Sequence, residues 1–319
     1  MTQPLNLLVA GGGIGGLAAA YVLGRCGHQV TVLEQSHAFG EIGAGIQLGP
    51  NIFKMFEYLG LADAVTVKLV SGESVRGDAL IGADGLWSRI REAVVGDGKP
   101  RVSGHVAYRA VLKCEDVPQH LWNDEVLLWG GEKTHLVHYP LRRGELFNLV
   151  AVFHSDKYDE GWNTFGDTAE LNERFANAVP QVKELLGKIE TWKMWVLCDR
   201  EPVRNWSQGR ATLLGDAAHP MLQYLAQGAG QAIEDAVVLG QAVKAANGKV
   251  EEAFVKYQDA RYLRTGRVQL TARFYGDIYH ASGVTRELRN RMFQGGKESA
   301  GFAGLKWMYE GIDPERLFA

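Results

Sequence analysis

Residues 5–16 of this chain read Leu5-Asn6-Leu7-Leu8-Val9-Ala10-Gly11-Gly12-Gly13-Ile14-Gly15-Gly16. The apolar run predicts a buried strand, and the glycines predict a tight turn into a helix at residues 17–23. In the G-x-G-x-x-G spacing, one glycine makes the turn, one admits a pyrophosphate and one allows close helix–strand packing. The helix N-terminus then presents unpaired N–H groups to the phosphates. We therefore expect four cofactor-binding glycines here: Gly11, Gly13, Gly15 and Gly16.

A second strand is predicted at residues 28–33, and it ends on Glu34. In dinucleotide-binding folds, an acid at about this position binds a ribose hydroxyl. Glycine-rich turns are common, so the glycine spacing by itself is a weak signal. The succession of strand, glycines, helix, strand and terminal acid is far more specific. It predicts a dinucleotide site in which Glu34 binds the ribose.

The same apolar run raises the alternative of a signal peptide or a membrane span. However, the first six residues of the chain carry no Lys or Arg, no small-residue cleavage pattern follows, and six glycines interrupt residues 5–24. The formal net charge of −3 is too small to suggest a nucleic acid or an anionic membrane as partner. Cys26, Cys114 and Cys198 lack the spacing of a metal site. We expect a soluble cytoplasmic protein with buried thiols and no bound metal.

The pattern of predicted strands and helices changes twice along the chain. Residues 135–141 and 146–153 predict a β-hairpin around the turn at 142–145, and further strands are expected at 106–112, 126–129 and 192–197, with a helix at 168–178. A short strand at 211–214 and long helices at 230–246 and 250–280 follow. The fold class expected is α/β, with a Rossmann-like domain interrupted by an antiparallel-sheet domain and followed by C-terminal helices. The discontinuous cofactor domain is placed at residues 1–100 and 200–319, and the substrate domain at 101–199.

Two more glycine-containing motifs follow predicted strands. One is Gly82-Ala83-Asp84-Gly85, and the other is Gly215-Asp216-Ala217-Ala218-His219-Pro220. Either motif by itself is more simply a turn. In this order after the glycine fingerprint, the set resembles the three signatures of the single-component FAD-dependent aromatic hydroxylases, over residues 5–289. The resemblance implies FAD as cofactor, with Asp84 near the pyrophosphate and the nicotinamide path and with Gly215 and Asp216 at the flavin ribityl chain.

Three further stretches are most similar to family members that hydroxylate small phenolic acids. They are residues 40–51, 135–141 and 220–229. The resemblance implies conversion of 3-hydroxybenzoate to 2,5-dihydroxybenzoate (gentisate) through a flavin C4a-hydroperoxide, with salicylate or 6-hydroxynicotinate as alternative substrates. It also implies cofactor contacts from Gly45, Gly228 and Ala229. NADH, or NADPH, is expected as a transient reductant without a second glycine fingerprint.

In this family, the residues that match His135, Tyr139 and Gln223 surround the aromatic ring, and the His takes the phenolic proton. A phenolate attacks an electrophilic oxygen better than a phenol does, so a base with a pKa near neutrality is useful. Strand alternation puts His135, Val137 and Tyr139 on one face, with His135 and Tyr139 about 13 Å apart, and His138 on the other. Without the resemblance, a hydrogen-bonded structural His and a loop amide are the simpler interpretations of His135 and Gln223. Arg109 either binds an anionic group or is a surface residue, and His219 is expected to hold its loop.

One departure from the family is large. Only 21 residues separate Gly60 from Gly82, where the family carries roughly 80 more, and Lys68-Leu69 resembles a join. Either the protein lacks this block, or a segment has dropped out of the sequence and the numbering closes over it. The second is favoured because the loss of strands would uncover large apolar faces. A remnant without flavin and a flavoprotein that inserts no oxygen are the alternatives to an active hydroxylase. The partners expected are a small aromatic acid, O₂ and a second copy of the chain in a homodimer.

Overall fold

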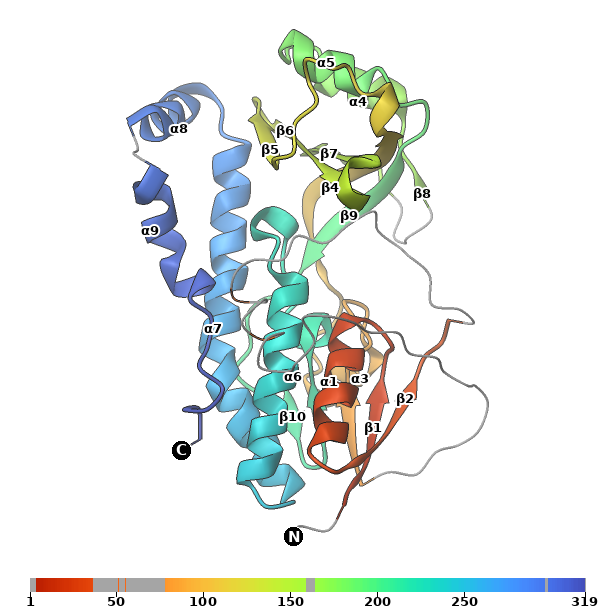
Figure 1. Cartoon of the computed structure of the whole chain (residues 1–319), viewed down its shortest axis with the longest axis vertical. Coiled ribbons are helices and arrows are strands. Elements are labelled where there is room, and N and C mark those ends of the chain that lie inside the picture. Colours follow the sequence, from red (N-terminus) through yellow and green to blue (C-terminus); the bar gives the residue numbers. More distant parts are fainter. Residues whose placement is uncertain are drawn as a thin grey trace.

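The structure is a computed structural model that describes residues 4–36, 51, 55, 78–158, 164–295 and 298–318. These residues form two β-sheets with helices packed against both, and one long helix runs beside the two sheets (Figure 1). This arrangement confirms the expected α/β fold with a Rossmann-like unit, an inserted antiparallel sheet and C-terminal helices. Gly45 and the join at Lys68–Leu69 lie outside the described residues.

The first sheet has the strand order β10-β11-β3-β1-β2 and is parallel except for β10 at its edge. Helix α1 (Ile14–Arg25) connects the parallel strands β1 and β2, which need a crossover connection. Each of the three glycine motifs follows the carboxyl end of one of the adjacent strands β1, β3 and β11, so the three motifs meet at one edge of the sheet. The strands are β1 (Asn6–Ala10), β2 (Gln29–Leu33), β3 (Ala79–Gly82), β10 (Ser207–Gln208) and β11 (Ala211–Leu213).

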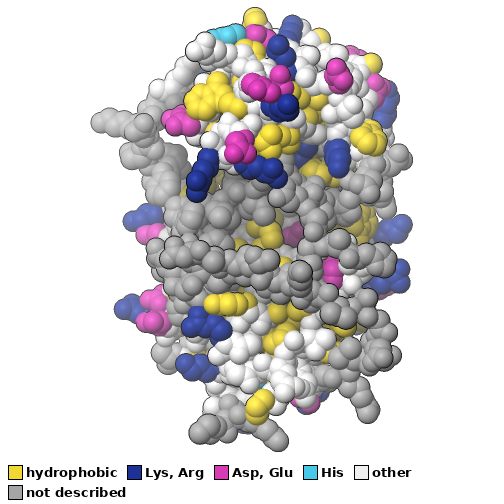
Figure 2. All heavy atoms as spheres, turned by 45° about the vertical axis from the view of Figure 1, so that its right-hand side comes forward, with side chains coloured by type: hydrophobic (Ala, Val, Ile, Leu, Met, Phe, Trp, Pro, Cys, Tyr) yellow, Lys and Arg dark blue, Asp and Glu magenta, His cyan; other side chains and the backbone are white. Residues whose placement is uncertain are grey.

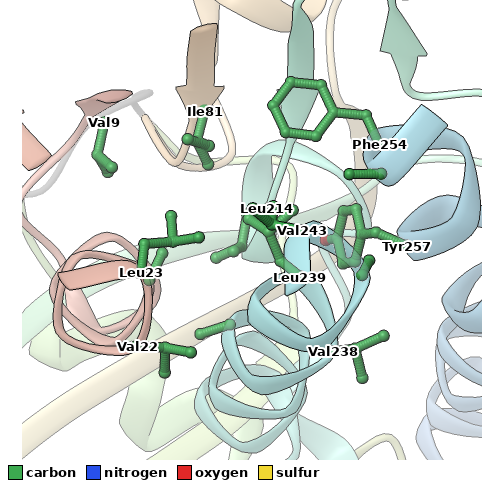
Figure 3. Close-up of a cluster of buried hydrophobic side chains, with 14 of the residues drawn as sticks. Val9, Val22, Leu23, Ile81, Leu214, Val238, Leu239, Val243, Phe254 and Tyr257 are labelled. Carbon is green, nitrogen blue, oxygen red and sulfur yellow. The ribbon is translucent and has the colours of Figure 1, made fainter. Parts of the chain in front are cut away.

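The first hydrophobic core lies between this sheet and helices α1 and α6 (Gly228–Ala245). Figure 3 shows Val9 and Ile81 of the strands gathered with Leu23 of α1 and with apolar side chains of α6. A Cβ atom on Gly240 of α6 would collide with Val22 of α1. The two helices therefore approach closely because a glycine lies at their contact, and this packing sets their N-terminal ends side by side at the motif edge of the sheet.

The second sheet is antiparallel, with the strand order β5-β6-β7-β4-β9-β8. One face is covered by α4 (Thr168–Arg174) and α5 (Pro180–Leu186), which close the second core. The prediction of one helix at 168–178 was wrong at its end, because Phe175 ends α4 and Pro180 starts α5 at a position where its missing N–H costs nothing. The strands are β4 (Arg101–Lys113), β5 (Leu127–Gly130), β6 (Thr134–Leu141), β7 (Leu146–His154), β8 (Thr164–Phe165) and β9 (Lys193–Asp199).

The opposite face of the second sheet packs on α7 (Val250–Tyr279) and on the short 3₁₀ helix η4 (Gln223–Leu225). Helix α7 is about 45 Å long at 1.5 Å per residue. Its first half joins the core of the first sheet through Phe254 and Tyr257, and its second half joins the second sheet through Val268 and Ala272 (Figure 1). It therefore holds the two sheets together. Helices α8 (Gly283–Gly295) and α9 (Glu298–Tyr309) follow.

The face drawn in Figure 2 carries basic and acidic side chains next to each other, without a broad field of one sign. This mixture agrees with the formal net charge of −3. Within the described residues, no helix combines the length and the apolar character that crossing a membrane requires.

Candidate active site

The glycine turn after β1 forms an open cradle at the N-terminus of α1. Gly11 has φ +107°, and a Cβ atom there would collide with the carbonyl oxygen of Ala83 at the end of β3. A Cβ atom on Gly16 would collide with the carbonyl oxygen of Gly11. Gly13 is the N-cap of α1, makes no side-chain cap, and has free space on its Cβ side. The first N–H groups of α1 are thus available to an anion, as a pyrophosphate requires.

Gly15 is placed differently from the other three glycines. Its Cβ side faces Leu214, whose Cδ2 would lie 2.6 Å from an added Cβ atom, and Ala232 of α6. In the described residues it therefore serves the packing of α1 against its neighbours, and its contact with the cofactor stays a prediction.

Glu34 follows β2 and reaches back to the glycine turn. Its Oε2 atom accepts a hydrogen bond from the N–H of Gly12 at 2.6 Å, and its Oε1 atom accepts one from the N–H of Ser36 at 2.8 Å. The carboxylate is therefore held beside the cradle, at the end of the strand next to β1. This is where an acid that binds a ribose is expected, although ribose binding itself stays a prediction.

Asp84 has a structural task that its motif did not reveal. Its carboxylate accepts hydrogen bonds from Ser88 Oγ at 2.5 Å, from the N–H of Arg89 at 2.9 Å and from the N–H of Ile90 at 3.3 Å. It thus caps α3 (Arg89–Val94), where an acid is stabilised by the helix dipole. Its contact with the cofactor stays a prediction.

Arg91 of α3 joins the second motif to the third and was missed by sequence reasoning. The side chain is 1% exposed, and Nη1 donates to the carbonyl oxygens of Ala217 and Ala218 at 2.9 and 2.5 Å. The other side of its guanidinium pairs with Asp97 at 2.6 Å. Because these donors are fully used, Arg91 positions the turn that carries Asp216. The basic start of the predicted helix was the one signal for it in the sequence.

Asp216 lies in the 3₁₀ helix η3 (Gly215–Ala217), directly after β11. Its side chain is exposed at the surface, and Oδ1 would lie 3.7 Å from a Cβ atom added to Gly228 at the start of α6. Desolvation by surrounding protein atoms, together with nearby Asp235, raises the pKa of its carboxyl group. A hydroxyl-bearing ligand such as a ribityl chain would supply hydrogen bonds to this carboxyl group.

Helix α6 begins at Gly228, and its N-cap Gln227 forms no side-chain cap. The N–H groups of its first turn, which includes Ala229, are therefore available to a ligand, like those of α1. Two uncapped helix N-termini thus lie near the exposed acid Asp216. One suits a pyrophosphate, and the other suits the negative charge that a reduced flavin carries at its pyrimidine edge. The residues present fit FAD.

A buried ionic network holds the start of α6 in place. Arg261 of α7 pairs with Asp235 and Glu234, each at 2.7 Å, and His219 Nε2 lies 2.5 Å from Asp235 Oδ2. Although burial opposes ionisation of Asp235, His219 and Arg261 hold its pKa at about 2. Asn51 adds hydrogen bonds to Gln227 and Glu234. His219 therefore acts on the loop and the helix rather than pointing to a substrate, as expected.

On the substrate side, strand β6 alternates as predicted. Val137 packs toward η4 and α7, and the His135 ring lies 5.7 Å from the ring of Tyr224 on η4. Leu136 points into the opposite core, and the His138 ring lies 5.0 Å from that of Phe147. His138 accepts a hydrogen bond from Trp129 Nε1 at 2.7 Å, which agrees with a structural role.

Gln223 is anchored by a residue of the second sheet. Arg109 Nη2 donates to Gln223 Oε1 at 2.7 Å, and the guanidinium of Arg109 stacks over Trp195 with its carbon 4.5 Å from the ring centroid. Tyr139 lies close enough that the charge of Arg109 opposes the rise in its pKa that burial causes. The structure thus brings Arg109, Gln223 and Tyr139 together, and Arg109 is not the surface residue of the alternative interpretation.

Two polar groups lie beside Tyr139. Nε of Arg109 has no hydrogen-bond partner in the described part of the chain. Asn148, which is 1% exposed, lies opposite Tyr139 in the β6–β7 ladder, and hydrogen bonding from its side chain opposes the rise in the pKa of Tyr139 that burial causes. Buried polar atoms are seldom left unpaired, so Arg109 Nε fits a polar ligand. Arg109 and Asn148 also line a pocket of about 700 Å³ with basic and acidic side chains, which does not include His135, Tyr139 or Gln223 among its lining residues.

His135 is not the near-neutral base that was expected. It is 2% exposed, and burial, with a further contribution from nearby His105, lowers its pKa to about 3. The ring is therefore neutral at physiological pH and keeps a lone pair for a proton. Its Nδ1 atom lies 2.7 Å from His280 Nε2, which leaves its own Nε2 as the second nitrogen.

Comparison with known proteins agrees with this geometry. Residues 64–268 match the family of FAD binding domains, and residues 9–59 match the NAD(P)-binding Rossmann-like domains. The chain is 39% identical to a 3-hydroxybenzoate 6-hydroxylase of Polaromonas naphthalenivorans (strain CJ2) over an alignment of 383 positions, gaps included, that spans 96% of each chain. It is 46% identical to 3-hydroxybenzoate 6-hydroxylase 2 of Aquipseudomonas alcaligenes over 249 residues, 78% of this chain and 77% of that one. A salicylate hydroxylase in complex with its substrate has the same fold, with a TM-score of 0.79 and 23% identity over 99% of this chain and 98% of that one.

The comparisons also bear on the length of the chain. The 383 aligned positions exceed the 319 residues present here, so the Polaromonas relative carries residues without a counterpart in this chain. The place of the missing block, near Lys68–Leu69, stays a prediction. The Aquipseudomonas relative is of nearly the same length as this chain, because the same 249 residues are nearly equal shares of both.

Proposed function

This chain belongs to the FAD-dependent aromatic hydroxylases, and we propose that it hydroxylates 3-hydroxybenzoate at C6 to give 2,5-dihydroxybenzoate, with O₂ and a nicotinamide reductant. The observation that carries this proposal is the convergence of His135 and Tyr139 on β6 with the Arg109–Gln223 pair on one face of the second sheet. The relatives at 39% and 46% identity carry the name of this activity. The expected substrate is a small aromatic acid.

The cofactor sits at the motif edge of the first sheet in this proposal. Gly11, Gly13 and Gly16 hold the pyrophosphate, Glu34 the ribose, and Asp216 the ribityl chain. The Gly228–Ala229 turn faces the flavin, and Asp84 holds α3 behind it. When bound and reduced by NADH or NADPH, FAD supplies the activated oxygen for transfer. We assign residues 1–100 and 200–319 to this FAD-binding domain and 101–199 to the substrate domain, which agrees with the membership of the two sheets.

The remaining chemistry belongs to side chains of this chain. His135 Nε2 accepts the phenolic proton, which charges the ring carbons ortho and para to the oxygen. C6 of 3-hydroxybenzoate is para to that oxygen, so ionisation activates the carbon that is hydroxylated. The unpaired Arg109 Nε and the Asn148 amide bind the carboxylate, and Tyr139 and Gln223 orient the ring. An aromatic ring with an anionic group and a phenolic oxygen is therefore what these side chains suit.

The test is product analysis with a panel of acids. The purified holoenzyme is mixed with NADH or NADPH and with one of 3-hydroxybenzoate, salicylate or 6-hydroxynicotinate. The products are then separated by chromatography and identified by mass spectrometry. We expect 2,5-dihydroxybenzoate from the first acid at a rate well above that of the others. A protein without flavin absorbance would be the remnant, and NAD(P)H oxidation without a hydroxylated product from any acid would mark a flavoprotein that inserts no oxygen.

We also infer that the protein is a cytoplasmic homodimer. None of its three cysteines forms a disulfide, which suits a reducing compartment that supplies NAD(P)H, although only Cys198 is buried as expected, while Cys26 is exposed and Cys114 half-buried. Leu263, Leu270 and Phe274 share one face of α7 and are 70%, 53% and 57% exposed, and such an apolar stripe can pair with its own copy across a two-fold axis. Sedimentation equilibrium tests the dimer. The wild type should sediment as a dimer and Leu270→Glu as a monomer, and a monomeric wild type would refute the inference.

A further inference from the structure

A row of histidines leads from His135 on β6 to His105 on β4. His135 Nδ1 lies 2.7 Å from His280 Nε2, and His280 Nδ1 lies 3.2 Å from His105 Nε2. His105 Nδ1 in turn lies 2.8 Å from the hydroxyl oxygen of Tyr224. Each inner ring therefore uses one nitrogen toward each neighbour. This end-to-end linkage lets a proton enter a ring at one nitrogen while another leaves at the other.

The row also follows a gradient of exposure. His135 is 2% exposed and His280 is 9% exposed, whereas His105 is half-buried. His105 and His280 line a hollow of about 1030 Å³, and the exposed His154 and Asp277 lie on the same wall. The inner end of the row is thus at the substrate face, and its outer end is at a hollow with solvent-exposed walls.

All three rings are neutral at physiological pH. Burial is the main cause that lowers the pKa of His135 to about 3 and that of His280 to about 2, and it also lowers that of His105. Other charged groups act on the row as well. His154 on β7 disfavours a charge on both His105 and His280, and Arg289 on α8 disfavours one on His280. Asp277 on α7 favours a charge on His105, but less than His154 opposes it. A proton taken up by His135 is therefore retained on none of the three rings.

We propose that His280 and His105 relay the phenolic proton from His135 to water in the hollow, which rests on the proposed function. The substrate O–H gives its proton to His135 Nε2, and His135 Nδ1 gives one to His280 Nε2. His280 Nδ1 then gives one to His105 Nε2, and His105 releases the proton on Nδ1 to water, directly or through the Tyr224 hydroxyl. The bound phenol becomes a phenolate, one water molecule gains a proton, and every ring ends neutral in its other tautomer. The reverse movement resets the row when the product oxygen is reprotonated.

The test measures proton release, which does not require turnover. Anaerobic holoenzyme is mixed with 3-hydroxybenzoate in a stopped-flow instrument, in weak buffer with an indicator dye, and phenolate formation is followed by its ultraviolet difference spectrum. The variants His280→Gln and His105→Gln keep hydrogen-bonding groups at the same places but cannot relay a proton. The control is His120→Gln, since the exposed His120 pairs with Glu184 rather than with a ring of the row.

We expect the wild type and His120→Gln to release protons at the same rate, and the two relay variants to bind the acid with unchanged Kd but release protons about 10²-fold more slowly. Added imidazole should restore the rate in His280→Gly, because the hollow gives it access to the vacated place. Release at the wild-type rate by both glutamine variants would overturn the relay and leave the proposed function intact. A wild type that neither ionises 3-hydroxybenzoate nor hydroxylates it would overturn the proposed function and the relay with it. If the glutamine variants lose their flavin or do not fold, the proton release of His280→Asn, and that of His280→Gly with and without imidazole, is compared with the wild type instead.

Discussion

Arg109 on β4 donates a hydrogen bond of 2.7 Å to Gln223 on η4. This bond joins the second sheet to the loop that follows the last strand of the first sheet. It holds Gln223 at the face that carries Tyr139, and it uses one end of the guanidinium while Nε stays without a partner in the described residues. The Arg109 side chain thus positions a substrate-binding residue, Gln223, and offers a hydrogen-bond donor to the substrate itself.

Arg109→Met should weaken the binding of the aromatic acid. A hydrogen bond to a charged group is worth about 1.5–3 kcal/mol, so KM should rise about 10- to 100-fold. The measurement is steady-state kinetics with 3-hydroxybenzoate and with 3-hydroxybenzyl alcohol. The alcohol lacks the carboxylate, so its KM should differ little between Arg109→Met and the wild type. Lys113→Met, at an exposed position of the same strand, is the control. An equal loss with both substrates would assign Arg109 to the fold instead.

His135→Ala should separate flavin reduction from hydroxylation. The variant should retain flavin and oxidise NAD(P)H, yet lose about 10²–10⁴-fold in hydroxylation, which is the usual contribution of one general base. Hydrogen peroxide should rise as product falls, and activity should recover as the pH approaches the pKa of the phenol, near 10. Tyr139→Phe should lose less, because the base remains. His138→Gln on the opposite face of β6 is the control, and equal coupling in His135→Ala and the wild type would return His135 to a structural role.

Glu34→Ala should weaken FAD binding. The loss of a charge-assisted hydrogen bond to a ribose costs about 1.5–3 kcal/mol, so the Kd for FAD should rise about 10- to 100-fold. Titration of the apoprotein with FAD, followed by flavin fluorescence, gives this Kd. Glu92→Ala, at an exposed acid of α3, should leave it unchanged. If Glu34→Ala retains FAD as the wild type does through dialysis, Glu34 is not the ribose ligand.

His138 should make the protein sensitive to mild acid. Burial lowers its pKa from 6.5 to about 4, so between these values the unfolded chain binds more protons than the folded one. Stability is therefore retained above pH 6.5 and lost as the pH falls toward 4, by about 1.4 kcal/mol per pH unit from this residue. In urea unfolding between pH 7 and 5, His138→Gln should show a shallower loss than the wild type. His120→Gln, whose ring is exposed, should keep the wild-type slope, and so would His138→Gln if this account is wrong.

Much of the fold could be read from local patterns. The run from Leu5 to Gly16 and the strand ending at Glu34 predicted β1, α1 and β2 to within a few residues, because turn glycines and apolar runs act over short distances. The change from parallel to antiparallel texture also predicted the two sheets. The helix predicted at 168–178 ran past the end of α4 at Arg174, and α5 (Pro180–Leu186) was not predicted, because a single short helix carries too few turns for a clear apolar period.

The sequence by itself determined the fold class, the phosphate-binding turn and the face of β6 that carries His135 and Tyr139, because strand and helix periodicity are properties of neighbouring residues. Only the tertiary structure decided that Asp84 caps α3, that Arg109 meets Gln223 and that Asn148 lies opposite Tyr139. It also decided the pKa of His135, since that value depends on burial and on nearby His105. It likewise brought His280, 145 residues away in the chain, to 2.7 Å from the His135 ring. Burial and long-range pairing arise from how sheets and helices pack, and no local pattern of residues encodes them.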